Sequence, residues 1–191
     1  MSDKKRLGFA LCGSFCTFEK AIEQIKYLKR KNLDIVPIMS YNAYSTDTRF
    51  GKATGHINKI EEICGRKIIS TITDAEPIGP QKTLDILVIE PCTGNTIAKL
   101  ANGITDTPVP LAAKAHIRNE RPLLIAVSTN DALSVAAANI GRLLNNKNIY
   151  FVPMKQDDCI KKPRSIVADF DKTYDAIICA LKNIQIQPIF T

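Results

Sequence analysis

One run of apolar residues limits the possible folds of this chain more than any other feature. Residues 84–90 read LDILVIE, a nearly continuous apolar stretch without the regular polar alternation of a half-exposed strand. Such runs are typical of strands buried on both faces of a parallel sheet, in which helices connect successive strands. The run therefore predicts an α/β protein.

Short apolar runs and longer amphipathic segments alternate along the rest of the chain, which is the pattern of repeated βαβ units. Strands are expected at residues 7–12, 35–39, 84–90, 123–127 and 150–152, with a short extended piece at 67–72. Helices are expected at residues 15–31, 56–64, 96–102, 110–119, 131–144 and 165–182, with a long polar loop at 40–55 and an irregular connection at 76–80. This order predicts a doubly wound parallel sheet of Rossmann-like, flavodoxin-like type in three layers, with residues 1–191 forming a single domain.

Composition argues against several classes of protein. No stretch approaches the roughly 18 to 20 uncharged apolar residues of a membrane-spanning helix, and the apolar run after the first residues is too short and strand-like for a signal peptide. We therefore expect a cytoplasmic protein without membrane contact. The six cysteines lie mostly within periodic apolar segments. This placement favours reduced, buried thiols over disulfides or a metal site.

The formal net charge of +7 makes nucleic acid a partner to consider. Lysines and arginines cluster only modestly, at residues 26–31 and 161–164, and aromatic residues make up 6% of the chain. We therefore expect solvated basic surface and no nucleic-acid site. The charge suits an anionic small substrate or an acidic partner subunit equally well.

Small polar residues follow several of the predicted strands, where an open parallel sheet binds its ligands. After the first strand, residues 12–17 read CGSFCT, which allows a tight turn with hydroxyls and backbone N–H groups at a helix start. This loop could hold a phosphate, or Ser14 and Thr17 could simply cap the helix. There is no G-x-G-x-x-G motif, and the second strand ends in Met39-Ser40 without an acidic residue. A mononucleotide therefore fits better than a dinucleotide.

Two further loops have the same character. Residues 91–96 read PCTGNT, and their density of small polar residues exceeds what capping a helix requires. Residues 128–131 read STND after the next strand, with Asp131 expected as an N-terminal helix charge. Both loops are predicted to face the same ligand.

These segments carry a resemblance to a known family. Residues 91–106 are similar to the Asn-Thr signature of the homo-oligomeric flavin-containing cysteine decarboxylase family. Residues 11–19, 45–51, 75–80 and 156–158 more closely resemble its dipicolinate synthase B-chain branch, nearly end to end. The resemblance implies a Rossmann-like fold that binds FMN. The residues expected to contact it are Gly13, Ser14, Phe15, Thr17, Ser40, Asn42, Pro91, Thr93, Gly94, Asn95, Thr96, Ser128, Thr129 and Asn130.

The resemblance also implies an activity, namely the oxidation of dihydrodipicolinate, a 2,3-dihydropyridine-dicarboxylate, to dipicolinate in sporulating bacteria. This oxidoreductase reaction, on a CH–CH or CH–NH group, is expected to depend on a partner A subunit that binds NADP, and the chain itself to form trimers or larger homo-oligomers. A dicarboxylate calls for guanidinium partners, and Arg49 is the candidate, although it could equally be a surface arginine. No catalytic base is identified.

Departures from the decarboxylase pattern narrow the function. The stretch 78–82 lacks the family's catalytic histidine, and residues 128–131 replace its Pro-x-Met-Asn motif, so cysteine decarboxylation is not expected. His56 and His116 are predicted to have ordinary packing or surface roles. Two alternatives remain: another flavin enzyme of the fold, such as a flavin prenyltransferase, and a non-catalytic flavin-binding subunit that docks on a partner.

Overall fold

The computed structural model describes residues 4–191, and its centre is a mostly parallel sheet. The parallel strands are β1 (Arg6–Leu11), β2 (Asp34–Met39), β3 (Ile86–Cys92), β4 (Leu123–Thr129) and β5 (Ile149–Phe151). They lie in the order β2-β1-β3-β4, with β5 paired beside the first half of β4. This is the flavodoxin-type order, with its topological switch point between β1 and β3. The predicted fold class is confirmed.

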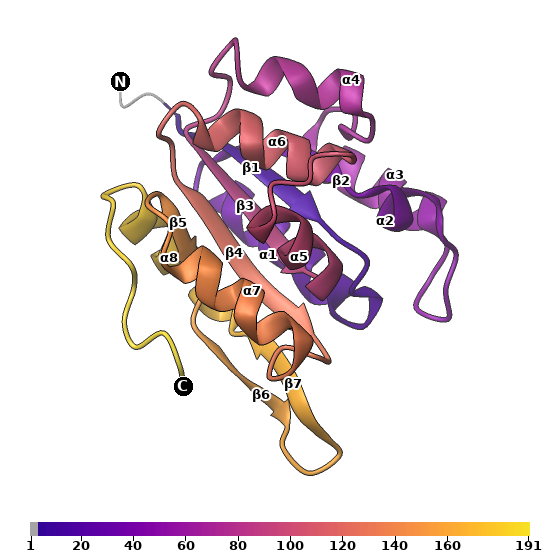
Figure 1. Ribbon diagram of the computed structural model, residues 1–191. Coiled ribbons are helices and arrows are strands. Elements are labelled where there is room, and N and C mark those ends of the chain that lie inside the picture. The colour runs from indigo at the N-terminus through magenta and orange to yellow at the C-terminus, as the bar shows by residue number, and fades with distance from the viewer. Residues whose placement is uncertain (1–3) are drawn as a thin grey trace.

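Helices cover both faces of the sheet and complete the three layers, as Figure 1 shows with α5, α6 and α7 in front and α1 and α8 behind. The helices are α1 (Phe18–Arg30), α2 (Tyr41–Ser45), α3 (Ala53–Cys64), α4 (Ile72–Ala75), α5 (Gly94–Ala101), α6 (Pro108–Ile117), α7 (Val135–Leu144) and α8 (Thr173–Ala180). Short 3-10 turns occupy Phe15–Thr17, Glu76–Ile78 and Phe170–Lys172. None of the helices in residues 4–191 is long and apolar enough to cross a membrane.

The core consists of two apolar clusters, one on each face of the sheet. Every residue of β3 is buried, as the nearly continuous apolar run at residues 84–90 predicts. Val88 belongs to the cluster under α1 and α8, while Leu87 and Ile89 belong to the cluster under α6. The alternation follows from the two-residue period of a strand, so one strand supplies both halves of the core.

An antiparallel hairpin replaces part of the predicted terminal helix. Residues 162–168 form β7 (Lys162–Ala168), which pairs with β6 (Met154–Asp158) and with Ser128 and Thr129 at the end of β4. The prediction of one helix over residues 165–182 is therefore wrong in its first half, and α8 begins only at Thr173. The β-branched Ile166 and Val167 suit this strand, and pairing with the free edge of β4 satisfies its backbone groups. The hairpin projects beyond the sheet in Figure 1.

Local hydrogen bonds explain the smaller differences. The loop at 40–55 contains α2, and α3 begins at Ala53, earlier than predicted, because the Asp47 carboxylate accepts from the Ala53 N–H at 2.8 Å. Helix α7 begins at Val135 instead of residue 131, because the Leu133 N–H donates to the Arg164 carbonyl in the hairpin. In residues 67–72 the only ladder contact is the bridge between Ile38 and Ile69.

Candidate functional site

Helix starts surround the carboxyl ends of β2 and β3. Ser40 precedes α2 and accepts a hydrogen bond from the Ala43 N–H at 3.3 Å. Thr93 precedes α5 and accepts one from the Thr96 N–H at 3.5 Å. Both residues are helix N-caps, which is the role that Ser and Thr favour after a strand. The caps direct the positive ends of two helices toward the same edge of the sheet.

A cavity of about 320 Å3 lies at this edge. Four chain segments supply its walls: the loop after β1, the start of α2, the start of α5, and the residue before α6. The lining residues are Gly13, Phe15, Ser40, Tyr41, Asn42, Thr93, Asn95, Thr96, Lys99 and Thr107. Half of the residues named from the sequence as cofactor contacts therefore come together around one space, and the sequence reasoning missed Tyr41 and Thr107.

Three hydroxyl groups form a cluster next to this cavity. The Ser14 Oγ lies 2.8 Å from the Ser128 Oγ, and the Thr17 Oγ1 lies 3.4 Å from the same Ser128 oxygen. Neither Ser14 nor Thr17 makes a side-chain capping bond to its helix. The hydroxyls, which the sequence left as either caps or phosphate ligands, thus face one another across two loops. The Thr17 hydroxyl itself donates to the Ser14 carbonyl at 2.9 Å, so the Ser14 and Ser128 hydroxyls are the members of the cluster that can donate to an anion.

The backbone N–H groups of the first loop contribute less than expected. The Ser14 N–H donates to the Cys12 carbonyl at 2.8 Å, and the Thr17 N–H donates to the Ser14 carbonyl at 3.0 Å. Both donors are used within the loop. Side-chain hydroxyls, more than these two amides, are the groups that this conformation offers to a phosphate.

Close packing fixes the end of β3 and the start of α5. The Glu90–Pro91 peptide bond is cis, and the Pro91 carbonyl accepts from the Cys12 N–H at 3.1 Å, which ties the end of β3 to the first loop. A Cβ atom on Gly94 would lie 2.8 Å from the Asp131 carboxylate and 2.9 Å from the Thr129 hydroxyl. Position 94 therefore needs glycine because α5 approaches the loop after β4 so closely.

Several residues named from the sequence do not line the cavity. Pro91 is buried within β3, Thr129 donates to Asp131, and Asn130 accepts from the Ser165 hydroxyl at 3.4 Å. Arg49 is exposed in the turn between α2 and α3, where its guanidinium lies 4.9 Å from the centre of the Phe50 ring. In Figure 1 the loop between α2 and α3 extends away from the sheet. Within this chain, the structure does not bring Arg49 to the cavity.

The described residues that line the cavity include one cation, Lys99, and no carboxylate or imidazole. Lys99 lines it and forms an ion pair with Asp106 at 2.7 Å, and this contact holds the pKa of the Asp106 carboxyl below its usual range. Among residues 4–191, no carboxylate, imidazole or thiol lines this cavity. The site can hold and orient a ligand through hydroxyls, an amide and one ammonium group, while general-base chemistry must come from elsewhere.

Three titratable residues that the sequence did not assign to the site, namely Glu90, His56 and His116, are buried in the core. Glu90, at the end of β3, is fully buried, and one carboxyl oxygen accepts from the Thr173 hydroxyl at 2.6 Å. Burial raises the pKa of Glu90 to about 8. His116 is buried against the Pro122 carbonyl at 3.0 Å, and burial lowers its pKa to about 4. His56 packs edge-on to the Phe18 ring, so both histidines have packing roles.

The strand order and the position of the cavity define a class of protein. A flavodoxin-type sheet with a polar cavity at the carboxyl ends of its strands, beside the switch point, is a Rossmann-like mononucleotide-binding architecture. The family model described as "Flavoprotein" matches residues 1–179.

Known proteins agree with this class. The B subunit of dipicolinate synthase from Bacillus subtilis is 48% identical over 185 residues, which cover 97% of this chain and 92% of that protein. The crystal structure of the corresponding B subunit from Bacillus halodurans superposes with a TM-score of 0.90 at 41% identity, covering 98% and 96% of the two chains. The FMN-dependent cysteine decarboxylase SpaF shares the fold, with a TM-score of 0.68, 23% identity and coverage of 92% and 97%. The chain therefore belongs to the flavoprotein family, within its group of dipicolinate synthase B subunits.

Proposed function

We propose that this chain is the FMN-binding B subunit of a dipicolinate synthase, a single-domain cytoplasmic protein. It takes part in the oxidation of dihydrodipicolinate to dipicolinate during sporulation, together with an A subunit that binds NADP. The identity of 48% with a dipicolinate synthase chain, over nearly the whole length of both proteins, supports a role in dipicolinate synthesis. The cavity at the strand ends, where three loops place hydroxyl and amide groups around one space, carries the cofactor part of the proposal.

The residues present fit a flavin mononucleotide. A volume of about 320 Å3 is near the lower end of ligand pockets, so a mononucleotide must extend beyond the cavity. Gly13 lines the cavity, and the next residue, Ser14, belongs to the hydroxyl cluster with Thr17 and Ser128. We assign the ring to the cavity beside Asn95 and the phosphate to the hydroxyl cluster.

The chemistry requires removal of a hydride and a proton from the substrate, and aromatisation provides driving force. A bound flavin supplies a two-electron acceptor. The chain's own residues hold and orient: Asn95 and the threonine hydroxyls offer donors and acceptors, and Lys99 offsets negative charge. Because no described residue of the cavity walls carries a carboxylate or imidazole, we assign the proton acceptor to the partner chain or to solvent.

Arg49 remains our proposed ligand for a substrate carboxylate, but at the cavity of a neighbouring copy of the chain. Its loop is held by paired hydrogen bonds between Thr48 and Gly51 and by the contact of Asp47 with Ala53. Since Arg49 does not line the cavity of its own chain, it would serve the cavity of a neighbouring copy in a trimer or larger assembly.

A second candidate function is a non-catalytic flavin-binding subunit that docks on its partner. The observation that favours it is again the absence of a proton acceptor among the described residues that line the cavity. The two functions differ in whether turnover with the A subunit requires flavin on this chain.

The test begins with the visible absorption spectrum of the protein after incubation with excess FMN and gel filtration. We expect a retained flavin band that Asn95→Ala weakens, because Asn95 lines the cavity and is exposed to the ligand. Oxidation of dihydrodipicolinate is then followed with and without the A subunit. If Asn95→Ala loses the flavin band but keeps full turnover with the A subunit, the docking function is supported. If the wild-type protein retains no flavin, the cofactor assignment is refuted.

A further inference from the structure

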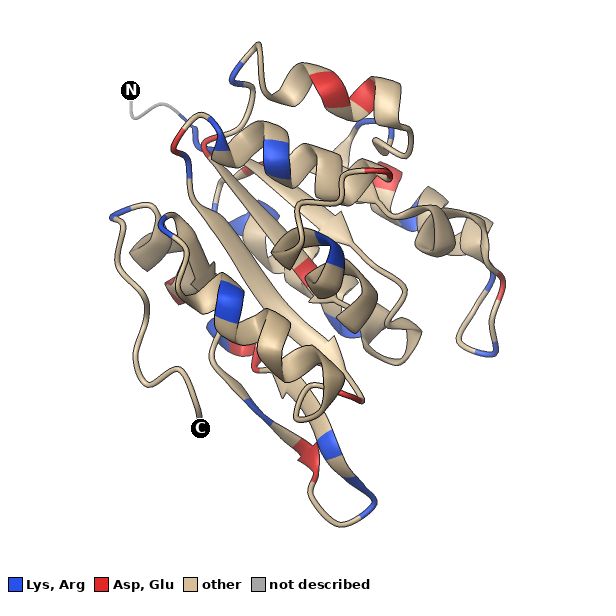
Figure 2. Ribbon diagram, in the orientation of Figure 1, with Lys and Arg blue, Asp and Glu red and all other residues tan. Residues whose placement is uncertain are grey.

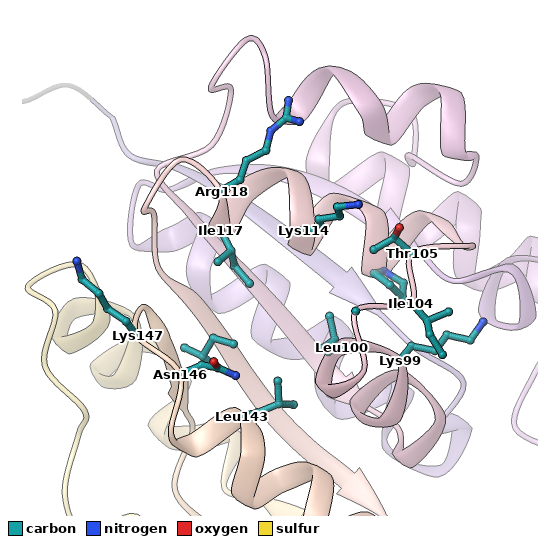
Figure 3. A pocket seen from close by; sticks show the side chains of 13 residues that line it. Lys99, Leu100, Ile104, Thr105, Lys114, Ile117, Arg118, Leu143, Asn146 and Lys147 are labelled. Atoms are coloured by element: carbon teal, nitrogen blue, oxygen red, sulfur yellow. The ribbon is translucent and has the colours of Figure 1, made fainter.

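A second cavity, of about 370 Å3, lies on the face of the sheet covered by α5, α6 and α7 (Figure 3). We call it the helix groove and define it by the floor residues Leu100, Ile117, Leu143 and Ile149 and the rim residues Lys114, Arg118 and Lys147. Its position is away from the strand ends that form the candidate flavin site, although Lys99 lines both cavities.

The groove exists because α5 is short. It has eight residues, or about 12 Å, whereas α6 and α7 each have ten, or about 15 Å. Gly103, with φ of 69°, lets the chain turn back toward α6 directly after α5. The C-terminal halves of α6 and α7 therefore face each other without a helix between them.

The floor of the groove is aliphatic. Leu143 is 1% exposed, while Leu100, Ile117 and Ile149 are half-buried and contact the core cluster on this face. Ile104, at the edge, is 46% exposed. Figure 3 shows Leu100, Ile117 and Leu143 around one space. Half-buried aliphatic side chains at a cavity gain from an apolar group that removes them from water.

The rim is cationic. Lys114, Arg118 and Lys147 line the groove and are exposed, and no Asp or Glu among residues 4–191 lines it. The one ion pair of these three within the described chain joins Lys147 to Glu120 at 3.9 Å, with both side chains 81% exposed, so solvent screens it. In Figure 2, α5, α6 and α7 each carry basic residues, which are coloured blue.

The cations point in different directions. In Figure 3 the side chains of Arg118 and Lys147 extend away from the space between Leu100 and Leu143, and Lys114 lies along one edge. A small anion would need donors that converge on one point. Diverging cations around an apolar floor instead match an extended surface, with apolar groups in the centre and acidic groups at the margins.

We propose that the helix groove docks an acidic segment of a different polypeptide, which inserts one or two apolar side chains between α6 and α7. Resting on the proposed function, we assign this segment to the A subunit. A second copy of this chain suits the groove less well. A two-fold contact through this face would place its cations against each other, and a head-to-tail contact would bring another face of a chain with net charge +7 to the cationic rim.

The test compares two charge-reversal pairs that change the net charge equally. Lys114→Glu with Lys147→Glu alters the groove rim, and Lys172→Glu with Lys182→Glu alters exposed lysines outside the groove, near the start and end of α8. Affinity for the purified A subunit is measured by sedimentation velocity at low and high salt. We expect the groove pair to weaken binding at least tenfold and to reduce its salt dependence, and the control pair to have an effect of less than about threefold.

Each other outcome overturns the docking proposal in a recognisable way. Equal effects of the two pairs would mean that the charge effect is not local to the groove. A changed oligomeric state of the isolated groove variant would mean that a second copy covers it. Failure of the wild-type chain to bind the A subunit, while it still retains FMN, would refute the partner and leave the cofactor assignment intact. Failure of both would refute the proposed function itself.

Discussion

The two cavities differ in chemistry although α5 borders both. At its start, Thr93, Asn95 and Thr96 give the flavin site a polar wall, whereas at its end Leu100 faces the aliphatic floor of the helix groove. The start of α5 follows a strand end, where Thr93 caps the helix, Thr96 is buried, and Asn95 is left exposed. Its end lies over the sheet, where apolar contacts stabilise the fold. The comparison teaches that an exposed polar residue of the flavin site, such as Asn95, can change with little loss of stability, while a buried floor residue of the groove, such as Leu143, cannot.

The largest expected effect is on stability. Leu143→Ala removes a side chain that is 1% exposed and should lower the free energy of unfolding by about 2–5 kcal/mol, with FMN retention unchanged at low temperature. Urea unfolding measures this. Leu144→Ala, at a neighbour that is 39% exposed, is the control and should cost less than about 1 kcal/mol. Equal losses would contradict the assignment of Leu143 to the floor.

The next largest effect is a dependence of stability on pH. It comes from Glu90, an ionisable residue that lies near the polar strand ends but is buried in the core. Its pKa is about 8 in the folded protein against 4.5 ordinarily, so the folded state retains a proton that the unfolded state releases. The contribution of Glu90 to the free energy of unfolding is therefore fully present below about pH 4.5. It is lost as pH rises toward about 8, by at most about 1.4 kcal/mol per pH unit.

Glu90→Gln should remove this dependence, because a neutral amide can replace the protonated carboxyl beside Thr173. The melting temperature of the variant should exceed that of the wild type at pH 9 and differ less at pH 5. Exposed Glu62→Gln is the matched control and should retain the wild-type pH profile. A variant that loses stability equally at both pH values would show that the carboxyl has another role.

A third effect concerns affinity rather than stability. Ser14→Ala and Ser128→Ala each remove one hydroxyl of the cluster, so each should raise the Kd for FMN about tenfold, in line with a lost hydrogen bond of about 1.5 kcal/mol to a charged group. Fluorescence titration with FMN and with riboflavin, which lacks the phosphate, provides the measurement. Equal losses for both ligands would argue against a phosphate at the cluster.

The smallest effect is expected at Lys99, which borders both cavities. Lys99→Met removes the cation that lowers the pKa of Asp106, so that pKa should return to its ordinary range. NMR titration of the Asp106 carboxyl measures the change, and a few-fold weaker FMN binding should accompany it. An unchanged Asp106 pKa would show that the pair does not persist in solution.

The sequence allowed prediction of the parallel strands to within two residues at each end, because buried strands carry their own apolar signal. The hairpin of β6 and β7 was not predictable in this way. Residues 162–164 are exposed, and the strand character of Ile166 and Val167 depends on the free edge of β4, which lies far away in the sequence. Likewise, Glu90 is the last residue of the predicted strand 84–90, where a carboxylate is expected to reach solvent, and only the tertiary packing with Thr173 of α8 shows that it is buried.

The sequence by itself determined the α/β class, the strand ends that carry polar residues, and the resemblance to flavin-binding proteins, because these features lie in local periodicity and short motifs. Only the tertiary structure decided which of those residues share one space. It placed Gly13, Asn42 and Asn95 around the cavity, paired Ser14 with Ser128, and left Arg49 outside. The physical reason is that contacts between residues distant in the sequence depend on the order of the strands in the sheet and on helix lengths, which no local pattern encodes.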